Sequence, residues 1–325
     1  MLDRILELGY NMGRSAYRTI CGITIVFIKE ENKEQDAMAL SAGSSEQPST
    51  YFVQDRTSER ELDRLRLQDH LATIGMGGTL PEQSNPAHFR SILDVGCGTG
   101  GWLIEVAQSY PGIARLVGVD ISQRMVAYAR EQASELHLSE RVEFQVMDAL
   151  RMLEFPNTSF DLLNLRLGSS YLRTWEWPKL LSEFRRVLRV GGVARITECD
   201  TIVESTGQAH LKLAQLLQQA LHQAGHLFTP THDGVSSQLA RLLTQYGFKD
   251  VQTRRHSLHF RNDDSSGLDG GEDAKYLFRT VAPFIRKWVG VVEDYEQLYQ
   301  QMLVEIQQPE FAATWNLVTA WGTKI

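Results

Sequence analysis

The sequence predicts an α/β protein, with a doubly wound and mostly parallel β-sheet and a helical cap. An apolar run at 91–95 leads directly into a glycine-rich loop and then into a helical pattern at 101–109. Strand and helix patterns go on alternating up to residue 197, which is typical of a parallel sheet with helices on both faces. Two later helical regions, 201–230 and 262–308, have no place in that alternation, and we expect them to form the cap.

The composition is that of an ordinary globular domain. The chain has 325 residues, of which 42% are hydrophobic and 22% charged, and this length suits one large domain with insertions. The net charge of −7 lacks the basic surface that binds a phosphate backbone, so we expect no nucleic-acid partner. Cys21, Cys97 and Cys199 are few and widely spaced, which indicates neither a disulfide framework nor a metal site.

The first 50 residues do not fit the alternation, and we expect them to form an N-terminal extension. Their apolar run at 20–28 is too short to cross a bilayer, which takes about 20 residues. Asp3 and Glu7 stand where a signal peptide would be basic, so we expect no export, no membrane anchor and a cytoplasmic location. Residues 39–50 are small, polar and rich in helix breakers, which predicts a linker or a disordered piece.

Residues 51–325 would then form the main domain. It divides into a leading helical segment at 51–88, a core at 89–200 and the two cap regions. The leading segment carries a partial apolar stripe among acids and arginines, and glycines and a proline at 75–81 break it.

The core is predicted element by element. Its strands are 91–95, 115–120, 142–147, 160–165 and 193–197. Ser122 is a good N-cap for the helix that follows the second strand. The helix before the fifth strand carries apolar residues from Leu180 to Leu188, and we expect it to end at Gly191-Gly192, a C-cap signal.

The second half of the chain predicts the remaining elements from apolar periodicity. They are a helix within 201–228, a helix at 236–246, a strand at 251–260, helices at 274–289 and 294–307, and a last strand at 311–323. The polar, glycine-rich stretch 262–273 predicts a loop.

The glycine-rich loop is the first functional signal. Gly96, Gly98 and Gly100 read G-x-G-x-G, whereas the dinucleotide fingerprint reads G-x-G-x-x-G. Glycines allow positive φ and close approach of a ligand to the backbone, and the helix start behind them leaves N–H groups without partners. In open α/β sheets ligands bind at this end of the strands.

Three acids close the first three strands. Asp120, 20 residues after Gly100, can accept both ribose hydroxyls, as in dinucleotide folds. Asp148 can accept an adenine amine, with the N–H of Ala149 facing a ring nitrogen, and Asp94 can reach the amino-acid end of a ligand or order the glycine loop. Three carboxylates suit a cofactor with an amine, a sulfonium charge and no phosphate, because they would repel a pyrophosphate.

These residues, together with other segments, resemble the class I S-adenosylmethionine (SAM)-dependent methyltransferases. The matching segments are Leu93–Gly100, Gly118–Ser122, Met147–Ala149, Phe160–Leu163 and Phe184–Gly192. The sequence is most similar to the ubiquinone/menaquinone C-methyltransferase-like, small-molecule branch, over roughly Tyr51 to Glu198 plus the final strand. One departure is Arg189-Val190-Gly191-Gly192, where the family usually has a proline before the glycines.

The resemblance implies a Rossmann-like sheet of seven strands with the seventh antiparallel, SAM as cofactor, and in-line methyl transfer to an O, N or C atom of a small molecule. It implies cofactor contacts at Asp94, Gly96, Gly98, Gly100, Asp120, Ile121, Asp148, Ala149 and Arg166. In such enzymes the leading helix commonly packs over the cofactor, which makes Tyr51 and Phe52 candidates; a solvated or core-capping helix is the alternative. Cys97 in the glycine loop receives no catalytic role.

On the substrate side we single out Tyr171, Glu198 and His210, with Asp200 beside Glu198. For Arg166 a sheet-end salt bridge is the alternative, for Glu198 and Asp200 a surface or capping role, and for His210 core packing. His222 and His226 have a spacing that metals can use, but they lie opposite the apolar stripe of their helix, so we expect a solvated face.

The aromatic residues of the second half have two interpretations, an apolar substrate pocket or ordinary core packing. They are Trp175, Trp177, Phe284, Trp288 and Tyr295.

Two other functions stay open. A SAM-binding protein without catalysis would carry the same motifs, because methyl transfer needs no invariant catalytic residue. A dinucleotide-dependent oxidoreductase is disfavoured by the G-x-G-x-G spacing and by the acids that close the first and third strands.

Overall fold

The computed structural model describes residues 16–20, 23–27, 50–53, 59–201, 204–261 and 270–325. Contacts divide the chain into two units, Met1–Glu46 and Gln47–Ile325. In the first unit β1 (Ala16–Ile20) and β2 (Ile23–Phe27) form an antiparallel pair. The predicted linker lies outside the described residues except for Thr50, so its disorder stays a prediction.

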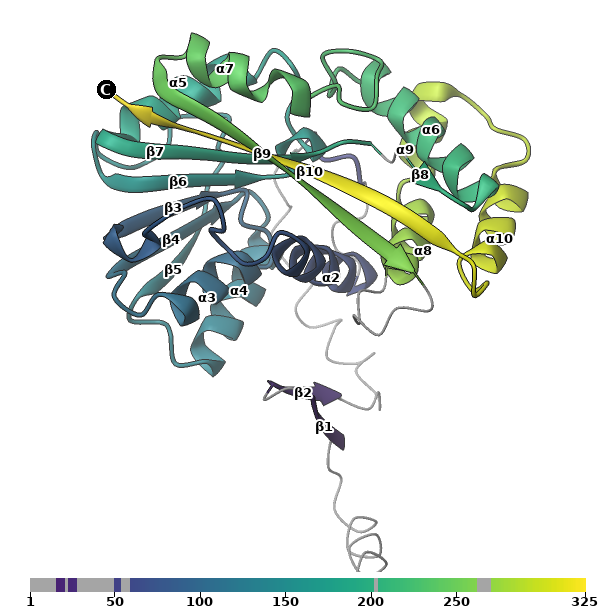
Figure 1. The fold of residues 1–325 in the computed structure, drawn as a ribbon, viewed down its shortest axis with the longest axis horizontal. Helices are drawn as coiled ribbons and strands as arrows, with labels where there is room; N and C mark the ends of the chain where they lie inside the picture. Colours follow the sequence, from purple (N-terminus) through teal and green to yellow (C-terminus); the bar gives the residue numbers. More distant parts are fainter. Residues whose placement is uncertain (1–15, 21–22, 28–49, 54–58, 202–203, 262–269) are drawn as a thin grey trace, which may run out of the picture. The chain divides into compact units, whose positions relative to one another are not determined.

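The second unit is built on one sheet of eight strands (Figure 1). They are β3 (Ser91–Val95), β4 (Arg115–Asp120), β5 (Val142–Val146), β6 (Phe160–Arg166), β7 (Leu188–Cys199), β8 (Glu204–Ser205), β9 (Phe248–Arg261) and β10 (Ala312–Lys324). The strand order is β5-β4-β3-β6-β7-β10, and both β8 and β9 pair with β10. Neighbours from β5 to β7 are parallel and β10 is antiparallel to β7, which confirms the predicted fold class.

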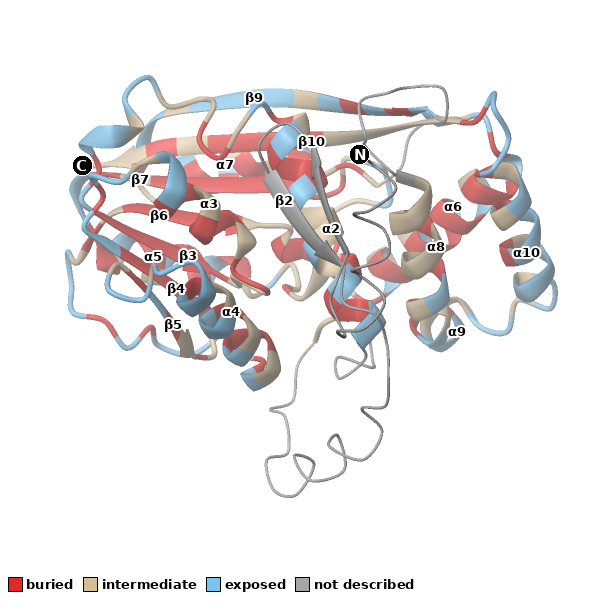
Figure 2. Ribbon diagram, turned by 90° about the horizontal axis from the view of Figure 1, so that it is seen from below, coloured by how far each residue is buried: buried red, intermediate tan, exposed pale blue. Residues whose placement is uncertain are grey.

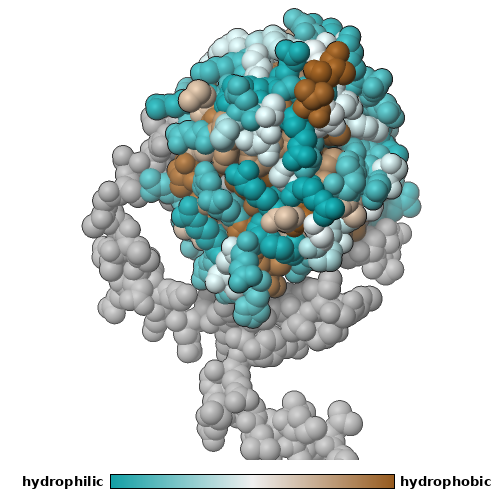
Figure 3. Space-filling view, turned by 90° about the vertical axis from the view of Figure 1, so that its left-hand side faces the viewer, coloured by the Kyte–Doolittle hydropathy of each residue, from teal (hydrophilic) through white to brown (hydrophobic). Residues whose placement is uncertain are grey.

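Helices cover both faces of the sheet and gather at one of its ends. They are α2 (Glu59–Gly75), α3 (Gly101–Ser109), α4 (Gln123–Glu135), α5 (Trp177–Val187), α6 (Gln208–Gln223), α7 (Leu239–Gln245), α8 (Gly270–Thr280), α9 (Ala282–Val289) and α10 (Tyr295–Glu305), with short 3-10 turns at Pro86–His88, Gly168–Ser170 and Ser236–Gln238. In Figure 1, α6, α8, α9 and α10 lie together beyond the carboxyl ends of the parallel strands. The opposite end of the sheet carries a mainly hydrophilic surface (Figure 3).

The central strands are buried along most of their length (Figure 2), and side chains on their two sides belong to two apolar layers. Ile92 packs with Trp102 of α3 and Val126 of α4. Its neighbour Leu93 belongs to the larger core that contains Trp177 and other residues of α5. Because successive side chains of a strand point to opposite faces, one apolar run serves both layers, as expected for a parallel sheet buried on both sides.

Two local predictions are wrong for identifiable reasons. The helix α5 ends at Val187, and Gly191-Gly192 is not its C-cap. The glycines lie inside β7, where Gly191 has φ +77° and the register shifts between Leu188 and Val193, so they form a bulge.

The predicted helix 274–289 is two helices, α8 and α9, separated at Val281. Pro283 lies in the first turn of α9 and has no N–H to continue α8. Ser122 does cap α4, since its side chain accepts the N–H of Met125 at 3.4 Å.

A buried ion pair connects the sheet to the segment that follows α2. Arg195 in the middle of β7 donates from Nε to Glu82 Oε1 at 2.7 Å, and both side chains have no exposed surface. Breaking one side of such a pair leaves a charge without a partner in a low-dielectric interior.

We therefore expect Glu82→Gln to lower the free energy of unfolding by about 3–5 kcal/mol, because Arg195 stays charged and buried. Denaturant unfolding measures the loss. The control is Glu154→Gln, which makes the same chemical change at an exposed position. Equal stability of the two variants would contradict the assigned role of the pair.

Candidate cofactor and substrate site

One cavity of about 470 Å³ runs from the carboxyl ends of the parallel strands to α6 and α8. Among the predicted cofactor residues, it is lined by Asp94, Gly96, Gly98, Asp120, Ile121, Asp148, Ala149 and Arg166. Tyr171, His210 and Asp200 of the substrate side also line it, whereas Glu198 and Gly100 do not. The structure thus brings together residues from four strands and the loops that follow them.

The glycine loop needs its glycines for two different reasons. Gly96, Gly98 and Gly100 all have positive φ, between +52° and +76°. A Cβ added at Gly100 would lie 2.5 Å from the ring of Phe144, so this glycine lets the loop pack against β5. A Cβ at Gly98 would meet nothing within 4 Å, and the cavity side of the loop therefore has room for a ligand at the backbone.

Asp120 organises this loop. Its Oδ2 accepts the N–H of Gly98 at 3.0 Å, and its Oδ1 accepts the N–H of Ser122 at 2.9 Å. A carboxylate has about four lone-pair sites, so a carboxylate that orders a loop can in general also accept hydroxyls of a ligand. The loop-ordering role that the sequence offered to Asp94 belongs to Asp120.

Asp94 lies deeper and has a different partner. Its Oδ1 accepts a hydrogen bond from Nδ2 of Asn164 at 2.7 Å, and only 4% of the residue is exposed. Burial raises the pKa of Asp94 to about 7, against the opposing effects of Asn164 and Arg195. A carboxyl that titrates near neutrality at the end of β3 can respond to a cationic group of a ligand.

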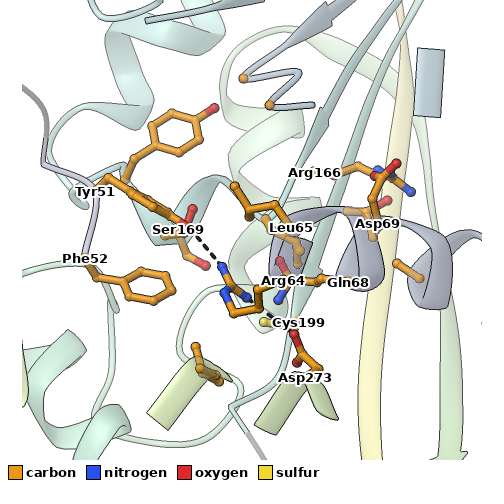
Figure 4. A pocket seen from close by; sticks show the side chains of 18 of the residues that line it. Tyr51, Phe52, Arg64, Leu65, Gln68, Asp69, Arg166, Ser169, Cys199 and Asp273 are labelled. Carbon is orange, nitrogen blue, oxygen red and sulfur yellow. Dashed lines mark hydrogen bonds and ion pairs between the residues drawn. The ribbon is translucent and has the colours of Figure 1, made fainter. Parts of the chain in front are cut away.

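The remaining cofactor candidates are tied into the walls. Asp148 accepts the N–H of Leu150 at 2.9 Å, which fixes the turn after β5. Arg166 forms an ion pair with Asp69 and donates to Thr73 Oγ1 at 3.0 Å, both on α2 (Figure 4). The alternative of a sheet-end salt bridge therefore holds for Arg166, and its contact with a cofactor stays a prediction.

The leading segment does pack over the cavity. Tyr51 and Phe52 both line it, and the hydroxyl of Tyr51 donates to Glu61 Oε1 at 2.6 Å. Arg64 lies between Tyr51 and Asp273 in Figure 4 and donates from Nη2 to the Tyr51 hydroxyl at 3.0 Å. These buried charges attach α2 to α8 of the cap.

Tyr171 and Glu198 differ in their access to the cavity. The Tyr171 hydroxyl is buried without a hydrogen-bond partner among the described residues and lies against Gly96. Burial raises the pKa of Tyr171, so the phenol remains a proton donor. Glu198 instead accepts from the hydroxyl of Ser169 at 2.6 Å and from its N–H at 3.1 Å, so it holds the cavity wall rather than lining it.

Of two histidines considered from the sequence, His210 lines the cavity and His226 does not. His210 lines the cavity, contacts Ser205 Oγ through Nδ1 at 2.9 Å, and burial lowers its pKa to about 4, so its ring is neutral at pH 7. The solvated face predicted for His226 is wrong: its side chain is buried, with Nδ1 2.8 Å from the carbonyl of Ser169. The reason is that α6 ends at Gln223, after which Gly225 turns the chain back at φ +84°.

The aromatic residues, Asp200 and Cys97 were the remaining candidates. None of the five aromatic residues singled out in the second half lines the cavity; Trp177 is buried in the core and Trp175 is 64% exposed. Asp200 does line it, bonded to Ser236 and 2.6 Å from Arg255. Burial raises the pKa of Cys97, which keeps it a thiol. The described residues contain no cluster of metal-ligand side chains.

Sequence reasoning missed two polar residues in the middle of apolar strands, Asn164 of β6 and Arg195 of β7, both fully buried. The signal was present, because each interrupts a run that otherwise reads as a buried strand. It also missed Arg64, which shares one face of α2 with Glu61, Leu65 and Gln68 by helical spacing.

The charges of the cavity are unbalanced. Six carboxylates line it, from Asp69, Asp94, Asp120, Asp148, Asp200 and Asp273. Among the described lining residues the arginines are Arg64 and Arg166, and each is paired with a carboxylate. The cap end is apolar, with Ala214, Leu217, Leu221, Leu227, Leu277 and Phe278.

The sheet order, the antiparallel β10, the G-x-G-x-G loop and the carboxylates at the strand ends define a nucleoside-binding α/β fold of the methyltransferase class. Room at Gly98, the unpartnered hydroxyl of Tyr171 and the acidic lining fit SAM, which carries an amine, a sulfonium and no phosphate. Residues 92–192 match the family described as the methyltransferase domain. Residues 92–192 therefore carry a SAM-dependent methyltransferase domain, with SAM as its cofactor.

Similar curated proteins include phosphoethanolamine N-methyltransferase 3 of Arabidopsis thaliana, 35% identical over 34% of this chain and 21% of that protein. Demethylmenaquinone methyltransferase of Porphyromonas gingivalis is 27% identical over 60% of this chain and 83% of its own length. The ubiquinone/menaquinone biosynthesis C-methyltransferase of Geobacter sulfurreducens is 33% identical over 34% of this chain and 42% of that protein. The chain thus spans about a fifth of the Arabidopsis relative and less than half of the Geobacter one.

Phosphoethanolamine N-methyltransferase 2 of Haemonchus contortus, in complex with S-adenosylhomocysteine, has a TM-score of 0.45 and 18% identity, covering 84% of this chain and 59% of that one. No helix of the described residues is long and apolar enough to cross a membrane.

We expect Asp120→Ala to weaken S-adenosylhomocysteine binding by about 1–3 kcal/mol or more, because it removes a charged acceptor from two hydroxyls and releases the N–H of Gly98. Isothermal titration measures the change. Glu131→Ala, which removes an exposed carboxylate from α4, is the control. Unchanged affinity in folded Asp120→Ala would remove Asp120 from the site.

S-adenosylhomocysteine binding should also strengthen as the pH rises from about 6 to 8. Above its raised pKa, Asp94 is ionised and attracts the ligand's ammonium; below it, the neutral carboxyl attracts it less. Titrations across this range test the slope, and Asp94→Asn should flatten it. A wild-type affinity that does not vary with pH would contradict contact between Asp94 and the amine.

Proposed function

We propose that the protein transfers the methyl group of SAM to an O, N or C atom of a neutral, largely apolar small molecule by in-line displacement. One observation carries the proposal: a single cavity joins the carboxylate-lined strand ends to an apolar chamber under α6 and α8. The cofactor residues and the chamber therefore share one cavity, as a direct transfer requires.

In this proposal the chain supplies position more than chemistry. SAM, when bound, supplies a methyl group that its sulfonium already activates. Asp120 would hold the ribose, Asp148 and Ala149 the adenine, and Asp94 the amino-acid end. Holding two reactants in line can contribute about 7–11 kcal/mol to lowering the barrier, and a cap that excludes water supports such alignment.

Proton transfer, where the acceptor needs it, would fall to His210. Its ring is neutral at pH 7 and lines the cavity, so it can accept a hydrogen bond from the acceptor, while its lowered pKa makes it a weaker base than an exposed histidine. Positioned general bases contribute about 10²–10⁴-fold. Tyr171 would act as a hydrogen-bond donor, because its raised pKa keeps the phenol protonated.

The charges of the cavity support a neutral acceptor. Three of the six lining carboxylates, those of Asp69, Asp200 and Asp273, are paired with arginines. Neither lining arginine balances the other three, so a phosphate or carboxylate group would meet net repulsion. This separates the proposed substrate from the phosphoethanolamine named for the Arabidopsis and Haemonchus relatives. We propose that regions 201–230 and 262–308 form the substrate cap over the core at 89–200.

The test is methyl transfer from labelled SAM to a pool of neutral aromatic and aliphatic alcohols, amines and ring carbons, with phosphoethanolamine as the comparison acceptor. We expect label in neutral products and at least tenfold less in phosphocompounds, and loss of transfer in Asp120→Ala. Tight S-adenosylhomocysteine binding without transfer to any acceptor would favour the non-catalytic SAM-binding alternative. Transfer to phosphoethanolamine would contradict the electrostatic argument.

A further inference from the structure

A chain of buried polar groups runs across the sheet and ends at Asp94. Arg195 of β7 donates from Nε to Glu82 and from Nη1 to Asn164 Oδ1 at 2.7 and 2.6 Å. Asn164 of β6 donates from Nδ2 to Asp94 Oδ1 at 2.7 Å. The side chains of Glu82 and Arg195 have no exposed surface, and Asn164 is fully buried, so water does not compete for these bonds.

The donors and acceptors in this series of hydrogen bonds can be assigned in only one way. A guanidinium has donors and no acceptor, so the Asn164 atom that faces Arg195 must be the amide oxygen. The amide NH2 group then faces Asp94 and donates to it. If the amide of Asn164 were flipped, its NH2 group would face the donors of Arg195. Arg195 therefore determines that Asn164 presents its NH2 group to Asp94.

Arg195 is held in place from several sides. Glu82 fixes Nε and lies 3.4 Å from Nη2, and the guanidinium lies 5.8 Å from the centre of the Trp102 ring on α3. The indole of Trp102 donates to the carbonyl of Thr79 at 3.0 Å. Because the guanidinium of Arg195 is held in place, it holds the amide of Asn164 in one orientation. That amide in turn orients the carboxylate of Asp94 in β3.

We infer that Arg195 is a positioning residue for cofactor binding: through Asn164 it keeps the carboxylate of Asp94 ionised and oriented for the ammonium group of SAM. This inference rests on the proposed function, since it assumes that Asp94 meets the amino-acid end of SAM. Arg195 itself does not line the cavity, so it acts only through Asn164.

The electrostatic environment of Asp94 agrees with this role. Burial raises the pKa of Asp94, and the carboxylate of Asp120 on β4 raises it further. Asn164 on β6 and Arg195 on β7 oppose both effects. Cys97 and Tyr171 also face this group, but burial keeps both protonated and uncharged.

The experiment compares S-adenosylhomocysteine binding between pH 5.5 and 9 in the full-length protein and its variants. Asn164→Leu removes the connecting amide at nearly constant volume. We expect its binding midpoint to move upward by about one pH unit, with about tenfold weaker binding at pH 7. The double variant Glu82→Leu/Arg195→Met should show a shift in the same direction, since it removes the source of the amide orientation without leaving a buried charge unpaired.

The control is Thr319→Val, which breaks a buried hydrogen bond of 2.8 Å with Thr197 in the same sheet. It should change stability without moving the pH midpoint, whereas a merely structural role of Asn164 and Arg195 would leave all midpoints equal. Unmoved midpoints in Asn164→Leu and in the double variant would overturn the inference. Labelled-methyl transfer, measured on the same wild-type protein, reports separately on the proposed function.

Discussion

Parallel pairing of the central strands is the constraint on which the site depends. In a parallel sheet every strand runs the same way, so the residues that close β3, β4 and β5 meet at one edge although about 25 residues separate them along the chain. Asp94 is the last residue but one of β3, Asp120 is the last residue of β4, and Asp148 follows β5. Any change that disturbed the register by one residue would turn these carboxylates to the other face.

The carboxyl ends of these strands concentrate negative charge, and two kinds of hydrogen bond stabilise the carboxylates there. Asp120 and Asp148 satisfy backbone N–H groups of the turns that follow their strands, so their charge helps to hold the loops. Asp94 instead accepts a hydrogen bond from the amide of Asn164. That amide also accepts a hydrogen bond from Arg195, which lies two strands away from Asp94. A cofactor with positive groups completes this arrangement, while an anionic one would add to the repulsion.

Much of the core follows directly from the sequence. The strands at 91–95 and 115–120, the helix at 101–109 and the Ser122 cap are found at the predicted residues, because their apolar runs and breakers are local signals. The glycine pair at 191–192 misled the prediction, since glycine serves a helix end and a strand bulge equally well and only pairing with β6 distinguishes them. His226 was misplaced for a similar reason: its position depends on the turn at Gly225, which helical spacing does not encode.

The connections between distant residues could not be derived in this way. The sequence places Asn164 and Arg195 in apolar strands, yet nothing local says that they pair with each other, with Glu82 and with Asp94. A buried polar group is expensive unless it is satisfied, so its presence in a core strand already implies a partner from elsewhere in the chain. In this protein the partner of each lies on the neighbouring strand or on the segment after α2, and the chain of partners ends at a carboxyl group that faces the cavity. Polar interruptions of central strands therefore indicate buried partners elsewhere in the chain, here partners that connect to a residue of the cavity.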